Sequence, residues 1–168
     1  MRLRKQYLTK NDCYKAGRTI RPLGIMIHST GANNPSVARY VPGDEEIGRN
    51  TYGNHWDQTN TEYKAKFDKK LNKCAHAFVG RFADGLVGTV QTLPWNRRGW
   101  HCGRGKNGSA NDTHISFEIC EDGLTDASYF KAVYQEAVEL TASLCKEYNL
   151  DPLADGVVIC HQEGYRRG

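Results

Sequence analysis

The sequence predicts a single α/β domain in which a mixed β-sheet is flanked by helices. Three observations lead to this prediction. Short apolar runs of strand length recur along the chain, one later segment carries apolar residues at helical spacing, and a turn signal at 83–85 joins two of the strand-like runs. The length of 168 residues suits one compact domain that can bury a sizeable core. We therefore treat residues 1–168 as one unit.

The first third of the chain contains one predicted strand between two irregular stretches. Residues 1–23 are polar and irregular, and we expect them to lie as an arm over the domain. Residues 24–29 form a short apolar run that predicts a buried strand. Residues 30–60 are rich in Gly, Asn, Pro and Asp, which predicts a long loop with at most short helices. Loops of this length in compact domains are often functional.

The middle of the chain predicts a hairpin and a further strand. The runs 74–82 and 86–93 are joined by a segment containing Asp84-Gly85, a sequence that favours a hairpin turn. Residues 94–112 form a second long loop. Residues 113–120 alternate in polarity, so that two sets of side chains should face opposite sides of a strand: Ile115, Phe117 and Ile119 on one side, and His114, Ser116, Glu118 and Cys120 on the other.

The last third predicts a long helix and a final strand. Between 128 and 148 the apolar residues form one stripe at three- and four-residue spacing, made of Phe130, Val133, Ala137, Leu140 and Leu144. Asp126 or Ser128 can cap this helix. Residues 157–161 read as a buried strand, followed by a loop-like basic tail to Gly168. Because hairpin strands occur together with strands linked across a helix, the sheet should be mixed.

The composition argues against several classes of protein, namely disordered, nucleic-acid-binding and membrane-spanning proteins. Hydrophobic residues make up 39% and charged residues 25% of the chain, which is typical of a globular protein. The net charge of +4 is a mild basic bias without a dense basic run, so we expect no nucleic-acid partner. No apolar stretch of about 18 residues occurs, so we expect no membrane span. Residues 1–10 are charged and lack the apolar core of a secretory signal, so an extracellular substrate would be reached by lysis or another non-classical route.

The six cysteines form no CxxC pair. Four of them lie inside apolar elements and are expected to be small core residues: Cys74, Cys120, Cys145 and Cys160. In the absence of an export signal, free thiols are expected rather than a disulfide framework. Cys13 and Cys102 lie in loops, and this interpretation leaves them open as exceptions.

Two histidines are candidate metal ligands. His28 and His161 each lie at the carboxyl end of a short apolar strand. Neighbouring strand ends can bring two imidazoles together at one rim of a sheet, and imidazole is a common zinc ligand. A catalytic zinc needs three protein ligands and an open position. The competing interpretation is that these are two ordinary histidines at strand ends, because their separation in sequence shows nothing about their proximity.

Glu118 is a candidate general base, because a carboxylate within an apolar strand is costly unless it is paired or faces a cleft. The alternative is a solvated outer face. His76, Trp100 and His101 are candidates for contacting or orienting substrate, with Trp100 able to stack on a sugar ring. Packing roles compete with each of these. The glycines on both sides of His101 would allow close backbone approach to a ligand, whereas His55 and His114 are expected to be structural or surface residues.

Five segments occur in an order that resembles the zinc-dependent N-acetylmuramoyl-L-alanine amidase superfamily: Ile25–Gly31, Ala75–Phe78, Gly99–Gly103, Asn111–Glu118 and Ile159–Gly164. The superfamily includes phage amidase endolysins, bacterial anhydromuropeptide amidases and peptidoglycan-recognition proteins. The similarity is greatest to amidases of Firmicutes and their prophages, and it covers roughly residues 20–168. Each motif alone is weakly specific, whereas five in this order are highly specific.

This resemblance implies a zinc ion in a surface groove, held by His28 and His161, and hydrolysis of the amide between N-acetylmuramic acid and L-alanine in peptidoglycan. It makes Glu118 the acid/base. Some relatives use a tyrosine on a neighbouring strand instead, but Ala75 occupies that place here. The family also has a third ligand several residues after the second histidine. Glu163 follows His161 too closely for that role, so the resemblance leads us to expect the third ligand beyond Gly168.

Two other interpretations remain open. The first is a peptidoglycan-binding module without catalysis, which the incomplete ligand set favours and Glu118 disfavours. The second is a cysteine peptidase acting on the wall, with Cys102 or Cys13 as nucleophile and a histidine as base. Neither cysteine lies at an evident helix start, which weakens the second interpretation. Sensitivity to chelators or to thiol reagents would distinguish the two hydrolases.

Overall fold

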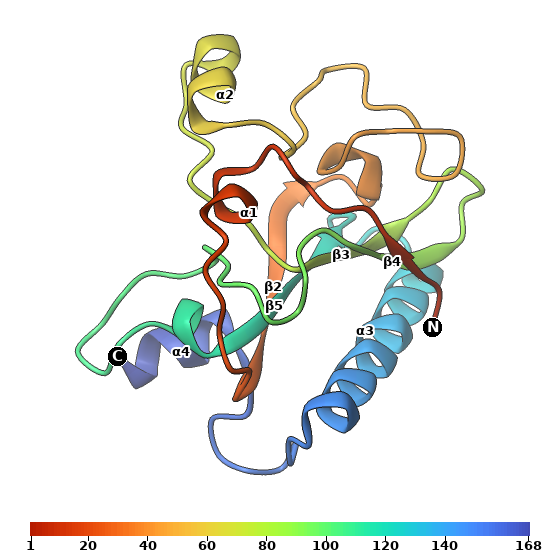
Figure 1. The fold of residues 1–168 in the computed structure, drawn as a ribbon. Coiled ribbons are helices and arrows are strands. Elements are labelled where there is room, and N and C mark those ends of the chain that lie inside the picture. Colours follow the sequence, from red (N-terminus) through yellow and green to blue (C-terminus); the bar gives the residue numbers. More distant parts are fainter.

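A computed structural model describes residues 1–168 and contains one six-stranded sheet in the order β1-β4-β3-β5-β2-β6 (Figure 1). The strands are β1 (Leu3–Lys5), β2 (Gly24–Asn33), β3 (Ala77–Arg81), β4 (Val87–Gln91), β5 (His114–Glu121) and β6 (Val158–Cys160). The α-helices are α1 (Asp12–Ala16), α2 (Asn60–Phe67), α3 (Ala127–Tyr148) and α4 (His161–Arg167), and the short 3-10 helices are η1 (Val37–Arg39) and η2 (Ala110–Asp112).

The sheet is mixed, as the sequence predicts. β3 and β4 form the antiparallel hairpin expected around Asp84-Gly85, with Ala77 opposite Gln91. All other neighbouring strands are parallel. β2 lies between β5 and β6, so the carboxyl ends of three parallel strands meet at one rim of the sheet. Ligand sites of open α/β sheets commonly form at such a rim.

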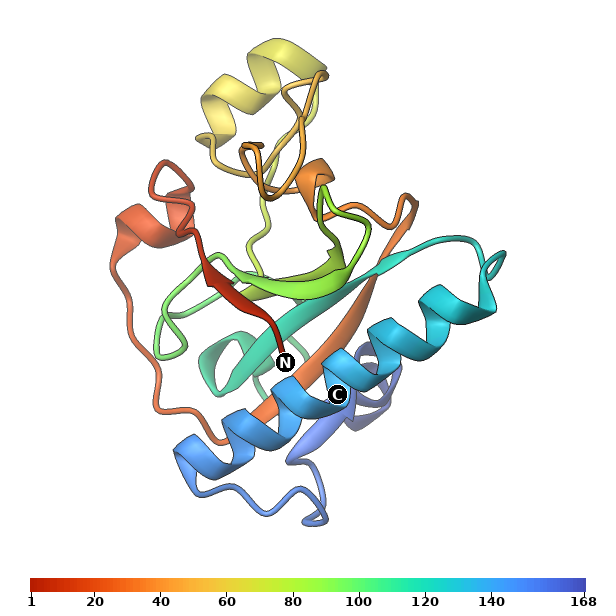
Figure 2. The ribbon, with the colours of Figure 1, turned by 90° about the vertical axis from the view of Figure 1, so that its right-hand side faces the viewer.

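Helix α3 covers one face of the sheet (Figure 2). Its N-cap is Asp126, whose side chain accepts hydrogen bonds from the amides of Ser128 and Tyr129. Its buried apolar side chains meet a core of strand residues on that face. Four members of the predicted stripe are buried: Val133, Ala137, Leu140 and Leu144. The prediction was wrong for Phe130, which is 54% exposed, because the neighbouring Tyr129 takes the inward position.

The opposite face of the sheet is covered by the first long loop. An aromatic group forms the centre of this packing: Tyr40 stacks on Phe78 at 4.6 Å between ring centroids, and Trp56 meets Phe78 edge-on at 4.9 Å. Leu8 from the N-terminal segment is also buried in this second core. The loop is therefore a packed layer that carries η1 and leads into α2 (Figure 1).

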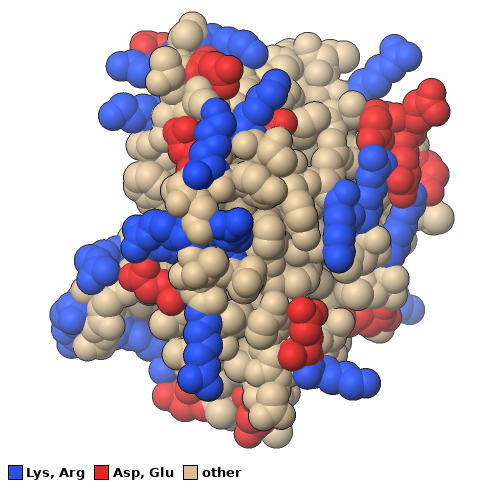
Figure 3. Space-filling view, in the orientation of Figure 1, with Lys and Arg blue, Asp and Glu red and all other residues tan.

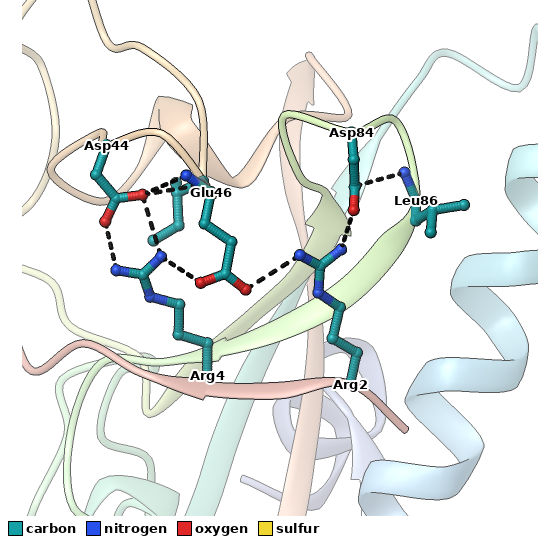
Figure 4. Close-up of polar contacts among 7 residues, drawn as sticks. Arg2, Arg4, Asp44, Glu46, Asp84 and Leu86 are labelled. Atoms are coloured by element: carbon teal, nitrogen blue, oxygen red, sulfur yellow. Dashed lines mark hydrogen bonds and ion pairs between the residues drawn. The ribbon is translucent and has the colours of Figure 1, made fainter.

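The N-terminal segment is more regular than predicted. Its first residues form β1, which pairs with β4 at the edge of the sheet, and a short helix follows as α1. Arg2 and Arg4 fasten β1 through ion pairs to three carboxylates on neighbouring loops: Asp44, Glu46 and Asp84 (Figure 4). Three residues are too few for periodicity to predict a strand, and the partners that stabilise it lie far away in sequence.

The C-terminal segment also differs from the prediction. Residue 161, expected to end the last strand, and residues 162–167, expected to be loop-like, form α4. Glu163 Oε2 accepts a hydrogen bond of 2.8 Å from the backbone N–H of Cys160. Gly164 permits close packing of this helix, because an added Cβ would lie 2.3 Å from the terminal methyl of Met26. Cys160 is exposed rather than part of the core, whereas Cys74, Cys120 and Cys145 are buried as expected.

The surface carries both signs of charge. In Figure 3, acidic side chains lie among the basic ones across the visible face. None of the helices combines the length and the apolar character needed to cross a bilayer.

Candidate active site at the carboxyl ends of β2, β5 and β6

The structure brings His28 and His161 together. His28 lies on β2, and His161 directly follows β6, whose Cys160 is the ladder partner of Ile27. The Nδ1 atoms of the two histidines are 3.0 Å apart. Burial, followed by the nearby His161, lowers the pKa of His28 to about 4, so the His28 ring is neutral at physiological pH. A neutral imidazole has the lone pair that a metal ion requires.

A third histidine continues the row. His101 Nδ1 is 3.1 Å from His28 Nε2, and the two rings meet edge-on. Burial is also the main cause that holds the pKa of His101 well below its ordinary value. If His28 donates from Nε2 to His101, its Nδ1 lone pair is free to face the Nδ1 of His161. His101 Nε2 is buried and has no hydrogen-bond partner.

Glu118 is the ladder partner of His28 on the adjacent strand β5. Both residues point away from the α3 side of the sheet, because Phe117 and Ile119 belong to the core beneath α3. Glu118 is half-buried, and no hydrogen bond contributes to the pKa of its carboxyl group. Burial raises the pKa of Glu118 to about 7, partly offset by the positive charge of Lys73. Such a carboxyl group is suited to exchanging protons near neutral pH.

The surroundings of Glu118 include residues that the sequence did not single out. Tyr40 is buried, and this burial raises its pKa to about 12. The negative charge of Glu118 contributes to that rise. The side chain of Lys73 lies over the Trp56 ring, 5.2 Å from Nζ to the centroid. Neither residue belongs to a recognisable motif. Their proximity to Glu118 results from the folding of the loops, which the sequence alone does not reveal.

His76 is placed behind the site rather than in it. The residue has no exposed surface, and its Nδ1 accepts a hydrogen bond of 3.0 Å from the amide of Ser116. Its Nε2 is 2.7 Å from the carbonyl oxygen of Arg97, to which it donates. Burial lowers the pKa of His76 to about 4. Both ring nitrogens are therefore used within the protein, so direct contact of His76 with substrate is a prediction that this geometry contradicts.

Trp100 is partly exposed, and the two glycines that flank the Trp100–Cys102 segment differ in how closely other atoms approach them. Trp100 is 47% exposed, and its backbone pairs in both directions with Cys74. An added Cβ on Gly99 would lie 3.0 Å from the carbonyl oxygen of Cys74, so this glycine serves packing against the protein rather than a ligand. Gly103 has open space around it. Trp100 therefore remains available for substrate, one residue from His101.

A cavity of about 490 Å³ lies beside His161. Its walls come from the 102–110 loop, α4 and His114, whose Nε2 is 3.0 Å from the carbonyl oxygen of Gly156. His114 is therefore more buried than a surface strand residue. Cys102 Sγ lies 3.6 Å from the hydroxyl of Ser109 and has no histidine as hydrogen-bond partner, so the cysteine-peptidase interpretation gains no nucleophile–base pair there.

The ligand set for a metal is incomplete within this chain. The structure contains no group of three or more His, Cys, Asp or Glu side chains arranged to hold a metal ion. Glu163 caps α4, and its Oε2 is used by the Cys160 amide. His28 and His161 are thus the two residues whose nitrogens face each other at the rim of the sheet.

Comparison with known proteins places this geometry in a family. The model of the N-acetylmuramoyl-L-alanine amidase family matches residues 18–167. The amidase CwlH of Bacillus subtilis (strain 168) is 42% identical over 148 residues, which is 88% of this chain and 48% of CwlH. The amidase XlyA of the same organism is 29% identical over 141 residues, or 81% of this chain and 36% of XlyA. The chain thus spans about half or less of the length of these relatives.

Solved structures agree in fold. PlyL superposes with a TM-score of 0.61 at 24% identity, covering 98% of this chain and 83% of PlyL. The catalytic domain of XlyA superposes with a TM-score of 0.59 at 22% identity, covering 98% of this chain and 86% of that domain. At such identities the likeness concerns the fold alone. The family model, however, matches nearly the whole chain, and the chain therefore belongs to the N-acetylmuramoyl-L-alanine amidase family.

Proposed function

We propose that this chain hydrolyses the amide bond between N-acetylmuramic acid and L-alanine in bacterial peptidoglycan, with zinc as cofactor. The observation that carries the proposal is the juxtaposition of His28, His161 and Glu118 at one rim of the sheet. Family membership supports the reaction, since the curated relatives bear the name of this activity. The substrate is therefore a polymer that must reach the site along an open face of the domain.

The residues present fit two zinc ligands. The Nδ1 atoms of His28 and His161 face each other, and His28 Nε2 lies 3.1 Å from His101 Nδ1, which can accept its N–H. Histidine ligands of zinc usually donate their second N–H in this way, which fixes the ring. His28 and His161 would hold the ion. Once bound, zinc would act as a Lewis acid that polarises the scissile carbonyl.

The chain's own residues would carry the proton transfers. Glu118 takes a proton from the water that attacks the lactyl carbonyl, and returns it to the amine of the departing L-alanine. A carboxyl pKa near 7 lets one group serve both steps. His101 holds the His28 ring in position, and the exposed face of Trp100 offers a stacking surface for a sugar or peptide group.

The test is digestion of purified peptidoglycan by the zinc-loaded protein, with the products separated and weighed by mass spectrometry. We expect stem peptides with a free L-alanine amino group and glycan strands that retain their lactyl carboxylates, without new reducing ends. New reducing ends would indicate a glycosidase, and cuts within the stem peptide would indicate a peptidase. Either result in place of free L-alanine would contradict the proposal.

A second candidate is peptidoglycan binding without catalysis. The observation that favours it is the two-histidine ligand set, which is one short of the number in catalytic zinc sites. Co-sedimentation with insoluble cell wall measures binding independently of cleavage. Binding without any released peptide, at saturating zinc and with fully folded protein, would favour this candidate over the hydrolase.

A further inference from the structure

Arginine side chains gather where the N-terminal segment meets the 94–112 loop. The two segments pair through their backbones, because Thr19 forms a bridge with Arg97. The amide of Arg98 also donates a hydrogen bond of 2.9 Å to the carbonyl oxygen of Arg18. This pairing brings three arginines together from distant parts of the sequence, and Arg104 joins them from further along the same loop. We call these four residues the arginine group: Arg18, Arg97, Arg98 and Arg104.

The arginine group has one acidic partner for its four positive charges. Asp112 accepts a hydrogen bond of 2.6 Å from Nε of Arg98, and its other oxygen lies 3.2 Å from Nη2 of Arg104. The hydrogen bond from Arg98 is the main cause that holds the pKa of Asp112 below its ordinary value, and the nearby charges of the group add to it. None of the ion pairs in the chain includes Arg18 or Arg97. Three positive charges therefore have no carboxylate, which is most of the net charge of +4.

The members of the group differ in how freely they can meet a ligand. The guanidinium of Arg97 donates to the carbonyl oxygen of Gly17 and lies 6.0 Å from the centroid of the Tyr14 ring, so this side chain is held against the protein. Arg18 is exposed, and the side chain of Arg104 is 71% exposed. Arg18 and Arg104 are therefore the two members most accessible to a ligand.

The arginine group lies next to the candidate active site. Arg98 is two residues before Trp100 and three before His101. The carbonyl oxygen of Arg97 accepts the hydrogen bond of 2.7 Å from Nε2 of His76, which lies behind the site. A polymer that contacts the exposed ring of Trp100 therefore also reaches the arginine group.

We propose that the arginine group binds carboxylates of the stem peptides that neighbour the one being cut. The proposal rests on the proposed function, since peptidoglycan is the substrate proposed there. Stem peptides carry free carboxylates, so the polymer presents anions that recur along each strand. Guanidinium groups bind carboxylates through paired hydrogen bonds. Exposed positive charges spread over two segments suit such recurring anions, and they speed and orient the encounter with an anionic partner.

Phosphodiester polymers would offer anions of similar chemistry, because guanidinium groups bind phosphate in the same way. The position of the arginine group favours the carboxylates. They belong to the molecule that must already lie across Trp100 for the amide to reach the rim of the sheet, whereas a phosphodiester chain has no such requirement. The two sources of anion are separated by the experiment below.

The experiment measures binding to insoluble peptidoglycan by co-sedimentation, with Glu118→Gln in every protein so that the wall stays intact. Arg18→Gln combined with Arg104→Gln removes the two most accessible charges. The matched control combines Lys131→Gln with Lys146→Gln, which removes the same charge from the exposed side of α3. We expect the arginine double variant to raise Kd for the wall roughly 3- to 10-fold at low ionic strength, and the lysine control to leave it unchanged. High salt should reduce the difference.

Two treatments of the wall identify the anion. Amidation of the stem-peptide carboxylates should weaken binding by the protein with an intact arginine group to the level of the double variant, and the substitutions should then have no further effect. Removal of phosphodiester polymers with hydrofluoric acid should leave the difference between the two proteins unchanged. The amidation measurement needs no arginine substitution, so it tests the proposal even if the double variant is unstable.

Two results would overturn the proposal. One is the same Kd for the arginine double variant and the lysine control at low ionic strength. The other is a difference that survives amidation and disappears when phosphodiester polymers are removed, which would assign the arginine group to phosphates. Binding is measured without cleavage, so failure of the proposed amidase function would appear separately, as the absence of released peptide when Glu118 is intact.

Discussion

His28 and Glu118 are directly opposite each other in the parallel ladder between β2 and β5. Residues paired in this way project from the same face of a sheet. The backbone register therefore places the proposed ligand and the proposed acid/base side by side before any loop contributes. The strands fix this relationship, while the loops supply its surroundings.

Replacing Glu118 by Gln should reduce peptide release from cell walls by about 10²-fold or more, the usual scale for a general acid/base. The amide is nearly isosteric, so zinc content and melting temperature should stay close to those of the unmodified chain. Glu147→Gln is the control, because this carboxylate is exposed on α3 on the far side of the sheet. Near-native turnover of Glu118→Gln would move the acid/base role to another group.

Replacing His28 by Ala should abolish stoichiometric zinc binding, because one of two facing imidazole nitrogens is lost. Metal analysis of dialysed protein measures this directly, without an activity assay. His55→Ala provides the comparison, since His55 lies in the first long loop and takes no part in the row of three histidines. Equal zinc in the His28 variant and the unmodified chain would exclude His28 as a ligand.

Two neighbouring residues of the 94–112 loop, Trp100 and His101, should have different effects: one on KM and the other on zinc affinity. His101→Ala should weaken zinc binding by about 10- to 100-fold, because it removes the hydrogen-bond partner of His28 Nε2. Trp100→Ala should leave zinc affinity unchanged and raise KM for soluble muropeptides, because Trp100 is 47% exposed and takes no part in the contact between His28 and His101. Zinc titration and steady-state kinetics on both variants test this division. The same zinc affinity in both would mean that His101 does not orient His28.

Asp126 gives a pH-dependent contribution to stability. Hydrogen bonds from the side chain of Ser128 and the backbone of Tyr129, together with Arg81, hold the pKa of this carboxyl well below its ordinary value. A depressed pKa in the folded state stabilises the protein above the unfolded value of about 4, and this contribution is lost as the pH falls further. Asp126→Asn should lower the melting temperature by roughly 2–4 °C at pH near 7.

The pH series supplies the control for this cap. The difference in melting temperature between Asp126→Asn and the unmodified chain should shrink steadily as the pH is lowered below about 4. A difference that stays constant across the series would show that the charge of Asp126 contributes nothing and that only its hydrogen-bonding shape matters.

The central elements were predictable because each is long enough to show a period. β5 and α3 lie close to their predicted bounds, and the hairpin turn was marked by Asp84-Gly85. β2 begins at the predicted residue but continues to Asn33, four residues into the segment predicted as a loop. The terminal elements β1 and α4 were not predictable, because they contain too few residues and depend on distant partners such as Glu46 for Arg4 and Met26 for Gly164.

The identity of the candidate site residues could be predicted from the sequence, but their arrangement in space could not. Strand-end histidines and a polar residue in an apolar strand are visible in one sequence, and the motifs linked them to a family. Which strands are neighbours is set by the sheet order, which places β2 between β5 and β6. The burial of His76 and the approach of His101 to His28 depend on how the 94–112 loop packs, and no local pattern encodes that.

Both edges of the sheet are made by strands of only three residues, β1 and β6. Unpaired backbone groups at a long, flat edge can recruit a strand from another molecule, and short or charged edges prevent this. Here one edge is also lined by the charged side chains of Arg2 and Arg4, which are ion-paired to Asp44, Glu46 and Asp84. The sheet is therefore a poor template for edge-to-edge aggregation.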